Sequence, residues 1–203
     1  FHPVKHITTG EGGAITTNNR KLYEKLRTLR NHGIHKDKKT AGKGQWYYEM
    51  RDLGFNYRIT DFQCALGLSQ LKRVDDFIGK RREIARIYDN EFQGIDGVGI
   101  PSRGMRKKHV YHLYVLRILF RKFDLCRKDF FNALKRKGIL CQVHYIPVYR
   151  QPYYRKEMTG RRAEFKNSDT YYGRAVSIPM YPAMKDSDVR SVVTGIKDLL
   201  KAG

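Results

Sequence analysis

The longest ordered pattern in the sequence is an apolar stripe at helical spacing over residues 62–92, and it sets the layout of the whole chain. The segment before it, Thr60-Asp61-Phe62-Gln63, has Thr at the cap position and Gln three residues later, which is typical of a capping box. The stripe therefore predicts one long helix that ends near Phe92. Its apolar residues are Phe62, Ala65, Leu66, Leu71, Val74, Phe77, Ile78, Ile84, Ile87 and Tyr88.

A glycine-rich stretch follows this helix and predicts a domain boundary. Residues 94–104 contain four glycines and one proline, which favour irregular backbone over helix or strand. We therefore expect two domains. The first covers residues 1–94 and includes the long connecting helix, and the second is a smaller α/β domain over residues 95–203.

The second domain alternates between strand-like and helix-like segments. Strands separated by helices predict an α/β fold built in layers. The expected strands cover residues 110–119 and 139–146, and the expected helices cover residues 127–137, residues 167–174 and a last segment that opens at residues 185–188.

The first domain opens with a different pattern. Residues 6–17 hold two short β-branched runs around a glycine-rich centre, which predicts a hairpin or paired strands. Asn18 and Asn19 then open a predicted helix, and Gly33 is its expected stop. Residues 35–45 are polar and contain glycine, so we expect a loop there.

The charge balance is strongly positive and bears on the choice of partner. The chain has 41 Lys and Arg against 20 Asp and Glu, a formal net charge of +21. Such a field speeds the approach of anionic ligands. The basic residues are spread along the chain, with no zinc-finger spacing, RNP-type motif or separate basic arm. We expect a solvated basic surface, and a basic nucleic-acid-binding module remains the alternative from another functional class.

Neither a membrane segment nor a metal site is expected. No apolar run approaches the length of a membrane span, and no signal-peptide pattern is present. The three cysteines, Cys64, Cys126 and Cys141, are widely separated and include no C-x-x-C pair. We therefore expect reduced, buried thiols in a cytoplasmic protein.

Lys5 is the first candidate for chemistry. A lysine amine attacks an aldehyde only after it loses its proton, which burial or neighbouring cations can bring about. Pro3 and Val4 before it, and the β-branched residues after it, would hold it on a rigid element. Taken alone, however, one lysine in so basic a chain is far more often a solvated surface charge.

Longer segments change this interpretation. FHPVKHITTGEGGA (residues 1–14), LGFNYRITDFQCALG (residues 53–67) and QVHYIP (residues 142–147) closely resemble three signatures of the DegT/DnrJ/StrS family of nucleotide-sugar aminotransferases, in family order. The resemblance implies a pyridoxal-phosphate-dependent enzyme of the aspartate aminotransferase-like fold (fold type I). This chain would supply the end of the large domain and the small C-terminal α/β domain.

The resemblance also implies roles for residues of the first domain. Lys5 matches the Schiff-base lysine that binds pyridoxal 5'-phosphate. Asn56 matches an asparagine that reaches the cofactor phosphate of the neighbouring subunit, which implies a homodimer with a shared active site. Arg58 is expected to pair with an anionic group, either a substrate diphosphate or the carboxylate of the amino donor. The alternatives are a turn-forming role for Asn56 and a surface or interface role for Arg58.

A second set of implied roles falls in the small domain. Gln142, His144, Tyr145 and Ile146 match a stretch that contacts the nucleotide-sugar in relatives, although a lone strand histidine is more often structural. Further aromatic residues are candidates for stacking on a uracil ring or lining a subunit contact, without a choice between the two. These residues are Tyr47, Tyr48, Tyr153 and Tyr154.

The implied reaction is amino transfer, with glutamate as the expected donor, to a UDP-linked 4-keto-6-deoxy hexose for a surface glycan. The sequence at residues 46–50, 64–67 and 143–145 is similar to the branch of the family that serves pseudaminic acid synthesis. Alternatives inside the family are another sugar nucleotide and a dehydratase-like relative that lacks the lysine, against which Lys5 argues. A non-catalytic partner that keeps only the dimer surface is a further alternative.

The resemblance also implies that part of the cofactor pocket lies upstream of Phe1. In the family, the acidic partner of the pyridine ring, the residue that stacks on the ring and the main phosphate loop all precede the lysine. The acidic partner matters because it makes the ring an electron sink. We therefore expect that these 203 residues alone bind the cofactor poorly and do not transaminate.

Overall fold

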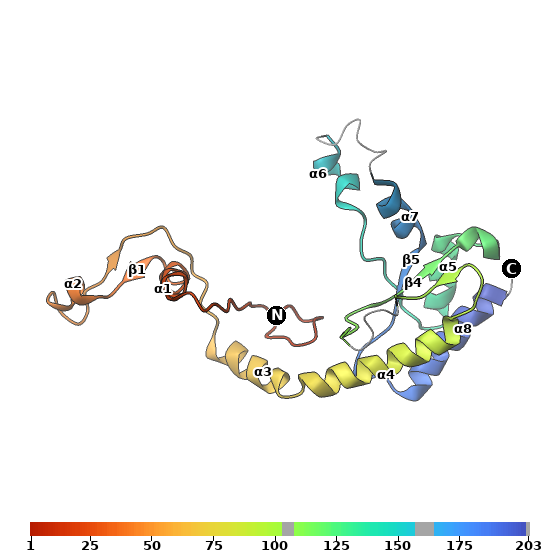
Figure 1. Ribbon diagram of the computed structural model, residues 1–203, viewed down its shortest axis with the longest axis horizontal. Helices are drawn as coiled ribbons and strands as arrows, with labels where there is room; N and C mark the ends of the chain where they lie inside the picture. The colour runs from red at the N-terminus through yellow and green to blue at the C-terminus, as the bar shows by residue number, and fades with distance from the viewer. Residues whose placement is uncertain (103–107, 157–164, 202–203) are drawn as a thin grey trace. The chain divides into compact units, whose positions relative to one another are not determined.

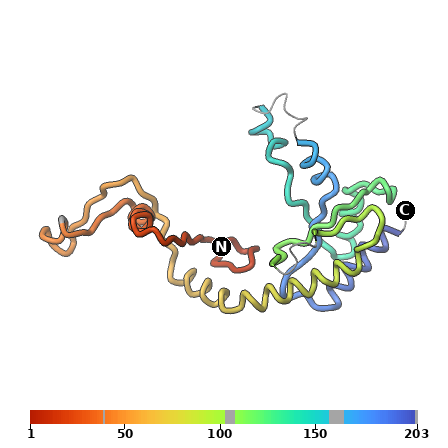
Figure 2. The backbone as a smooth tube through the Cα atoms, in the orientation of Figure 1, coloured from red at the N-terminus to blue at the C-terminus, as the bar shows by residue number. Residues whose placement is uncertain are grey.

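The computed structural model describes residues 1–102, 108–156 and 165–201 of the chain. Contacts divide the chain into two compact units, Phe1–Val74 and Asp75–Gly203 (Figures 1 and 2). The helices are α1 (Arg20–Leu29), α2 (Lys38–Ala41), α3 (Asp61–Leu71), α4 (Val74–Phe92), α5 (Arg127–Arg136), α6 (Pro152–Arg155), α7 (Lys166–Arg174) and α8 (Asp186–Lys201), with 3-10 turns η1 (Phe120–Phe123) and η2 (Val148–Arg150). The strands are β1 (Ile34–His35), β2 (Glu49–Met50), β3 (Val98–Gly99), β4 (Tyr114–Ile118) and β5 (Ala175–Ile178).

The division between the units falls directly after Val74, the first residue of α4, because the rest of this helix packs into the second unit. Ile84, Tyr88 and Phe92 are almost completely buried in the core that α4 shares with the sheet. Polar contacts add to this attachment, since the Tyr88 hydroxyl donates to the carbonyl of Pro179 at 2.8 Å. The domain boundary between residues 94 and 95 stays a prediction for the protein as a whole. Within this chain, α4 groups with the residues that follow it.

The prediction of one continuous helix over residues 62–92 is wrong. The chain forms α3 and α4 with a break at Lys72 and Arg73, where the amide of Arg73 donates to the carbonyl of Gln70 at 3.1 Å instead of continuing the helical ladder. Asp75 and Asp76 lie in the first turn of α4. Carboxylates are stabilised at a helix N-terminus, so this acidic pair marks the start of a new helix within an unbroken apolar stripe.

Both predicted caps in the first unit are confirmed. The side chain of Asn19 accepts a hydrogen bond from the amide of Leu22 at 3.0 Å and starts α1. At the start of α3, the Thr60 hydroxyl accepts from the amide of Gln63 at 3.3 Å, and the Gln63 side chain accepts from the amide of Thr60 at 3.1 Å. α1 ends before the predicted stop at Gly33, since its last residue is Leu29 and its C-cap is Arg30. Gly33 follows the helix with a φ of 68°.

The predicted hairpin over residues 6–17 is wrong, because this segment contains no strand. Its threonine side chains instead bond to nearby backbone, which competes with strand pairing. The Thr8 hydroxyl donates to the carbonyl of Phe1 at 3.0 Å, and the Thr9 hydroxyl donates to that of Glu11 at 2.5 Å. These bonds reach back to Phe1, so residues 1–11 form a closed loop, which contains Lys5 and is called the Lys5 loop below.

The predicted loop over residues 35–45 is only partly correct. β1 and β2 form an antiparallel pair, with Ile34 opposite Met50 and His35 opposite Glu49, and α2 lies between them in sequence. Arg51 stabilises the segment from β1 to β2, because its guanidinium contacts Asp37 at 2.6 Å and Glu49 at 2.8 Å.

The second unit is built on a three-stranded antiparallel sheet of order β3-β4-β5. Buried residues of α4, α5, α8 and the sheet form one hydrophobic core (Figure 1). The predicted helices here are confirmed as α5, α7 and α8, and the first predicted strand is confirmed over Tyr114–Ile118.

The second predicted strand, over residues 139–146, is wrong. Only Gln142 pairs with β5, through two backbone hydrogen bonds to Ser177 of 2.8 and 3.0 Å. Pro179 follows β5 and has no amide hydrogen, so the ladder cannot continue in that direction. The segment therefore lies beside the sheet at a single bridge.

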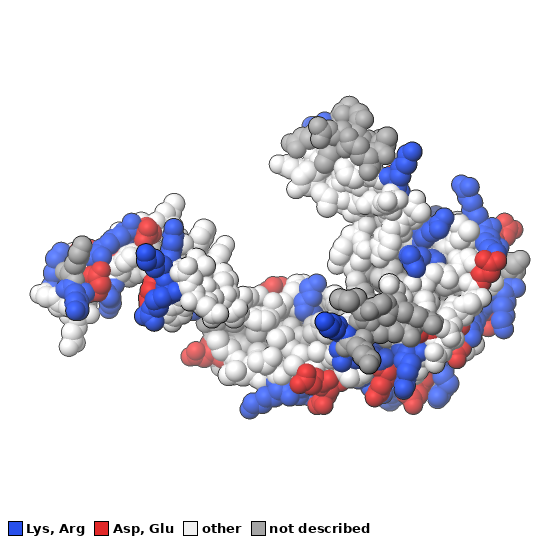
Figure 3. All heavy atoms as spheres, in the orientation of Figure 1, with Lys and Arg blue, Asp and Glu red and all other residues white. Residues whose placement is uncertain are grey.

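Basic side chains lie on the surface of each unit and alternate with acidic ones on the face shown in Figure 3. No helix in the described part of the chain has the length and apolar character that a membrane crossing requires. All three cysteines are free. The expectation of buried thiols holds for Cys141, whose pKa burial raises to about 12. Cys64 is only partly buried, and the expectation is wrong for Cys126, which is exposed at the start of α5.

Candidate active site

Lys5 lies in the closed loop at the start of the first unit, and its side chain is exposed. Backbone hydrogen bonds fix the loop, because the amide of Lys5 donates to the carbonyl of His2 at 3.0 Å and that of Thr9 donates to the carbonyl of Phe1 at 3.1 Å. Thr9 is buried, with 5% of its surface exposed. Lys5 is thus an accessible amine on a short, internally bonded loop.

This loop packs against the start of α3. The Gln63 side chain, which already caps α3, donates to the carbonyl of Glu11 at 3.1 Å. Space is tight on both sides of the contact. A Cβ added at Gly12 would lie 3.2 Å from Cδ1 of Ile59, and one added at Gly67 would lie 2.9 Å from Cγ2 of Thr9. Residues of the first two signatures, which are far apart in sequence, therefore meet at this contact.

Gln63 is a further functional candidate, which its sequence pattern alone does not indicate. The capping-box pattern predicted its bond to Thr60 but not its second bond to the Lys5 loop. A Gln at this position can make both bonds, because its side-chain amide has an acceptor oxygen and N–H donors. A Glu at this position would cap the helix equally well but could not donate to a carbonyl when ionised.

Asn56 and Arg58 lie on an extended segment that pairs with the end of α1. The amide of His32 donates to the carbonyl of Phe55, and the amide of Tyr57 donates to that of Arg30, both at 2.9 Å. Just before this pairing, the backbone at Gly54 passes very close to the backbone at Gly33. A Cβ added at Gly54 would lie 2.2 Å from the amide nitrogen of Gly33.

Asn31 connects the two candidate residues. Its backbone forms an antiparallel bridge with Asn56, and its side-chain oxygen accepts a hydrogen bond from Nη1 of Arg58 at 2.8 Å. Asn56 itself is exposed. Asn31 orients Arg58 without neutralising it, since an amide carries no charge. The sequence does not indicate this role of Asn31, because no local pattern links it to a residue 27 positions away.

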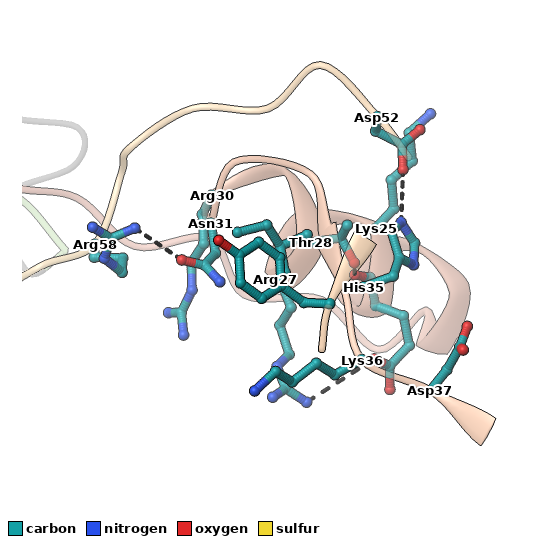
Figure 4. Close-up of a pocket in the computed structure, with 13 residues that line it drawn as sticks. Lys25, Arg27, Thr28, Arg30, Asn31, His35, Lys36, Asp37, Asp52 and Arg58 are labelled. Carbon is teal, nitrogen blue, oxygen red and sulfur yellow. Dashed lines mark hydrogen bonds and ion pairs between the residues drawn. The ribbon is translucent and has the colours of Figure 1, made fainter. Parts of the chain in front are cut away.

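Asn31 and Arg58 also border a basic hollow of about 1020 Å³ in the first unit (Figure 4). Figure 4 shows Arg58 reaching toward Asn31, and His35 paired with Asp52, with a distance of 2.9 Å from Nε2 to Oδ2. The hollow is lined by Glu24, Lys25, Arg27, Thr28, Arg30, Asn31, Ile34, His35, Lys36, Asp37, Tyr48, Asp52 and Arg58.

The remaining candidate residues lie in the second unit, around the bridge to β5. Nδ1 of His144 is 2.8 Å from Oγ of Ser177, so β5 orients the imidazole ring. The ring also meets Tyr145 edge-on, with centroids 4.6 Å apart. Tyr145 and Ile146 are 73% and 49% exposed, and Gln142 is exposed. These side chains are accessible to a ligand, and their proposed roles remain predictions.

The four other tyrosines differ in their surroundings. The Tyr47 hydroxyl donates to Glu49 at 3.1 Å and accepts from Lys43 at 3.2 Å. Hydrogen bonds from Arg51, Lys43 and Tyr47 lower the pKa of Glu49 to about 2. Tyr47 therefore belongs to a charged cluster. The other three tyrosines are exposed, namely Tyr48, Tyr153 and Tyr154. Stacking on a uracil ring and lining a subunit contact stay alternative predictions for them.

Comparison with known proteins connects these features to a family. The model of the DegT/DnrJ/EryC1/StrS aminotransferase family matches residues 1–197. The spore coat polysaccharide biosynthesis protein SpsC of Bacillus subtilis is 40% identical over 204 residues, which cover 99% of this chain and 52% of SpsC. A Campylobacter jejuni protein, named UDP-4-amino-4,6-dideoxy-N-acetyl-β-L-altrosamine transaminase, is 38% identical over 201 residues, which cover 99% of this chain and 51% of that protein.

A solved structure gives the same result for the fold. PseC of Helicobacter pylori, described as an aminotransferase involved in the biosynthesis of pseudoaminic acid, has a TM-score of 0.86 and 30% identity. The match covers 100% of this chain and 52% of PseC, and it confirms the predicted α/β fold class. The chain thus spans about half the length of the curated relatives it matches. From its sequence and its fold, the chain belongs to the DegT/DnrJ/EryC1/StrS aminotransferase family.

Proposed function

We propose that this chain carries the lysine-bearing half of a pyridoxal-phosphate-dependent aminotransferase that acts on a nucleotide-linked sugar. The observation that carries the proposal is the Lys5 loop. An exposed lysine lies on a loop that bonds to itself and to Gln63 at the start of α3. Catalytic groups need such support, because small displacements of a reacting group cost rate.

The side chains of the first unit fit the cofactor chemically. Pyridoxal phosphate offers an aldehyde and a phosphate, and when bound it supplies an electron sink. The Lys5 amine would hold the aldehyde carbon and then move a proton at the carbon that carries the amino group. The exposed amide of Asn56 would donate to the phosphate of the cofactor bound by the partner subunit of a homodimer.

We further propose that the acceptor is a UDP-linked 4-keto-6-deoxy hexose and that glutamate is the amino donor. The names of the Campylobacter jejuni and Helicobacter pylori relatives support this substrate class. Gln142, His144, Tyr145 and Ile146 would contact the nucleotide-sugar, and Arg58 would pair with the diphosphate or the donor carboxylate. We place the reaction in the cytoplasm. The similarity to SpsC supports a second candidate, another sugar nucleotide of surface polysaccharide synthesis.

The test uses a polypeptide in which this chain follows the upstream half that its relatives possess. Addition of pyridoxal phosphate is expected to give a visible absorbance band, together with amino transfer from glutamate. Lys5→Arg should remove the band and lower kcat by about 100- to 10,000-fold, because a guanidinium neither binds the aldehyde nor exchanges protons at neutral pH.

Lys21→Arg is the matched control, since Lys21 is an exposed lysine of α1 in the same unit. Both the band and the activity should persist in this variant. An unchanged band in Lys5→Arg would refute the proposal.

A further inference from the structure

A buried hydroxyl, that of Ser177, contacts the imidazole ring of His144 and has no part in the function proposed above. We propose that Ser177 is a positioning residue for His144. Its hydroxyl keeps the hydrogen of the neutral imidazole on Nε2, so that the ring donates a hydrogen bond to an acceptor oxygen of the nucleotide-sugar. The inference rests on the proposed function, which supplies the ligand of His144, and adds the residue behind that contact and the direction of its hydrogen bond.

Ser177 is a polar residue within a buried strand. All four residues of β5 are buried, and Val176 and Ile178 belong to the hydrophobic core of the second unit. Successive side chains of a strand point to opposite faces, so the side chain of Ser177 points away from that core. Ser177 is nevertheless covered, with 5% of its surface exposed. A covered hydroxyl costs free energy unless it makes a hydrogen bond.

Backbone pairing on both sides fixes the position of Ser177. On one side it lies opposite Val115 of β4. On the other side it exchanges two backbone hydrogen bonds with Gln142, of 2.8 and 3.0 Å. His144 follows Gln142 by two residues, so it lies diagonally across from Ser177 and within reach of its side chain. The distance from Nδ1 of His144 to Oγ of Ser177 is 2.8 Å.

The direction of this hydrogen bond follows from the acceptors available to the hydroxyl. A neutral imidazole carries one N–H, and its other nitrogen is an acceptor. Among the residues that the structure describes, the only hydrogen-bond partner of Oγ of Ser177 is Nδ1 of His144. If Nδ1 were the donor, the buried hydroxyl hydrogen would have no acceptor, which is unfavourable. The hydroxyl therefore donates to Nδ1, and the ring hydrogen is on Nε2.

This tautomer determines what His144 can recognise. With its hydrogen on Nε2 the ring is a donor, which suits the phosphate, hydroxyl and carbonyl oxygens of a nucleotide-sugar. Tyr145 limits the ring from a second direction, because the two rings meet edge-on with centroids 4.6 Å apart. A half-buried ring that is held in this way loses little freedom on binding, and such preorganisation contributes to affinity.

Isothermal titration with UDP-N-acetylglucosamine tests the proposal. The protein is the polypeptide that contains this chain and its upstream half, loaded with pyridoxal phosphate. We expect His144→Ala and Ser177→Ala each to weaken binding by about fivefold to tenfold, the effect of losing one hydrogen bond. The double variant should bind no more weakly than His144→Ala, because Ser177 acts only through His144.

A titration with UDP locates the acceptor oxygen. Equal losses with UDP and with UDP-N-acetylglucosamine would place the acceptor on the nucleotide. A loss with UDP-N-acetylglucosamine alone would place it on the sugar. Either result supports the role of Ser177, since both require the ring of His144 to be a donor.

Nitrogen NMR of isotope-labelled histidine shows the tautomer itself. In the wild type, Nε2 of His144 should carry the hydrogen and Nδ1 should not, and loss of the signals in His144→Gln identifies them. In Ser177→Ala both ring nitrogens should show the average of the two tautomers, because nothing then holds the hydrogen on one of them. Ser177→Thr keeps the hydroxyl and should restore both the wild-type signals and the affinity.

Ser191→Ala is the matched control. It removes an exposed serine hydroxyl of the same unit, which donates to the carbonyl of Ser187 at 2.9 Å within α8. It should change the affinity by less than about twofold, as is usual for a surface substitution. Folding of Ser177→Ala is checked with glutamate alone, which should change the visible band at the wild-type rate because this step needs no nucleotide-sugar.

The proposal is overturned if the wild type does not bind UDP-N-acetylglucosamine, if Ser177→Ala binds as tightly as the wild type, or if the effects of Ser177→Ala and His144→Ala multiply. A ring hydrogen on Nδ1 in the wild type would overturn it as well. Attachment of pyridoxal phosphate to Lys5 is measured separately. Normal attachment together with any of these results leaves the proposed function standing, whereas loss of the attachment refutes that function and not the role of Ser177.

Discussion

At the scale of single residues, the side chains that support the site were harder to predict than those within it. Lys5, Asn56 and Arg58 stand in recognisable sequence segments. Asn31 and Gln63 do not, because their roles depend on bonds to Arg58 and to the carbonyl of Glu11, which only the folded chain brings within reach. A sequence records local patterns, whereas these contacts span 27 and 52 positions.

Glu49 gives a pH-dependent prediction. Its pKa falls from 4.5 to about 2 because Arg51, Lys43 and Tyr47 bond to its carboxylate. A depressed pKa means that the ion pairs stabilise the segment from β1 to Arg51 above pH 4.5. This contribution is lost as the pH falls toward 2. Trp46 is the only tryptophan and lies 5.8 Å from the Tyr47 ring, so its fluorescence should report the loss.

In Glu49→Gln the emission at pH 7 should already resemble that of the wild type at low pH. Glu83→Gln, which breaks an exposed pair with Lys80, should leave the transition in place. Far-UV circular dichroism separates this local step from global unfolding. A full fluorescence transition in Glu49→Gln would contradict the assignment.

At the scale of elements, the starts of helices are easier to predict than strands or the length of a helix. The caps of α1 and α3 are local, since each needs only residues within three positions of the helix start. The strand predictions at residues 6–17 and 139–146 failed for a different reason. A strand requires a partner with free backbone groups, and a β-branched sequence does not reveal whether one is present. Thr8 and Thr9 bond to their own loop instead.

The crossing at Gly54 gives a prediction at this scale. In Gly54→Ala the new methyl group would overlap the backbone of Gly33, which cannot move aside as a flexible side chain would. We expect a loss of about 1–3 kcal/mol of stability and faster hydrogen exchange at the amides of His32 and Tyr57. These amides make the bonds that hold the segment of Asn56 and Arg58.

Gly42→Ala is the control for this substitution. No atom lies within 4 Å of a Cβ built at Gly42, which belongs to the same unit. Exchange at His32 and Tyr57 should stay at the wild-type rate in this variant. Equal exchange in Gly54→Ala and the wild type would show that the crossing does not hold the segment.

At the scale of the whole molecule, net charge was a poor guide to function. The charge of +21 suggested nucleic acid as one alternative, but the basic residues are distributed over both units among acidic ones (Figure 3). The family match and the fold favour an enzyme instead. Three ordered sequence segments carried more information than composition, because each specifies both residue type and position.

The chain spans about half of its relatives, and this leads to a prediction about the chain alone. We expect purified residues 1–203 to bind pyridoxal phosphate weakly and to show no amino transfer, because the pyridine-ring partner expected upstream is not among them. Absorbance titration with the cofactor measures the first effect, and a glutamate-dependent transfer assay measures the second. Normal affinity and turnover in residues 1–203 would contradict this expectation.

The central claim is that Lys5 is the residue to which pyridoxal phosphate attaches, and peptide mapping tests it most directly. The polypeptide with its upstream half is loaded with the cofactor, reduced with borohydride, digested and analysed by mass spectrometry. We predict a stable pyridoxyl adduct on the peptide that contains Lys5 and on no other lysine of the chain. An adduct on a different lysine, with Lys5 unmodified, would contradict the claim.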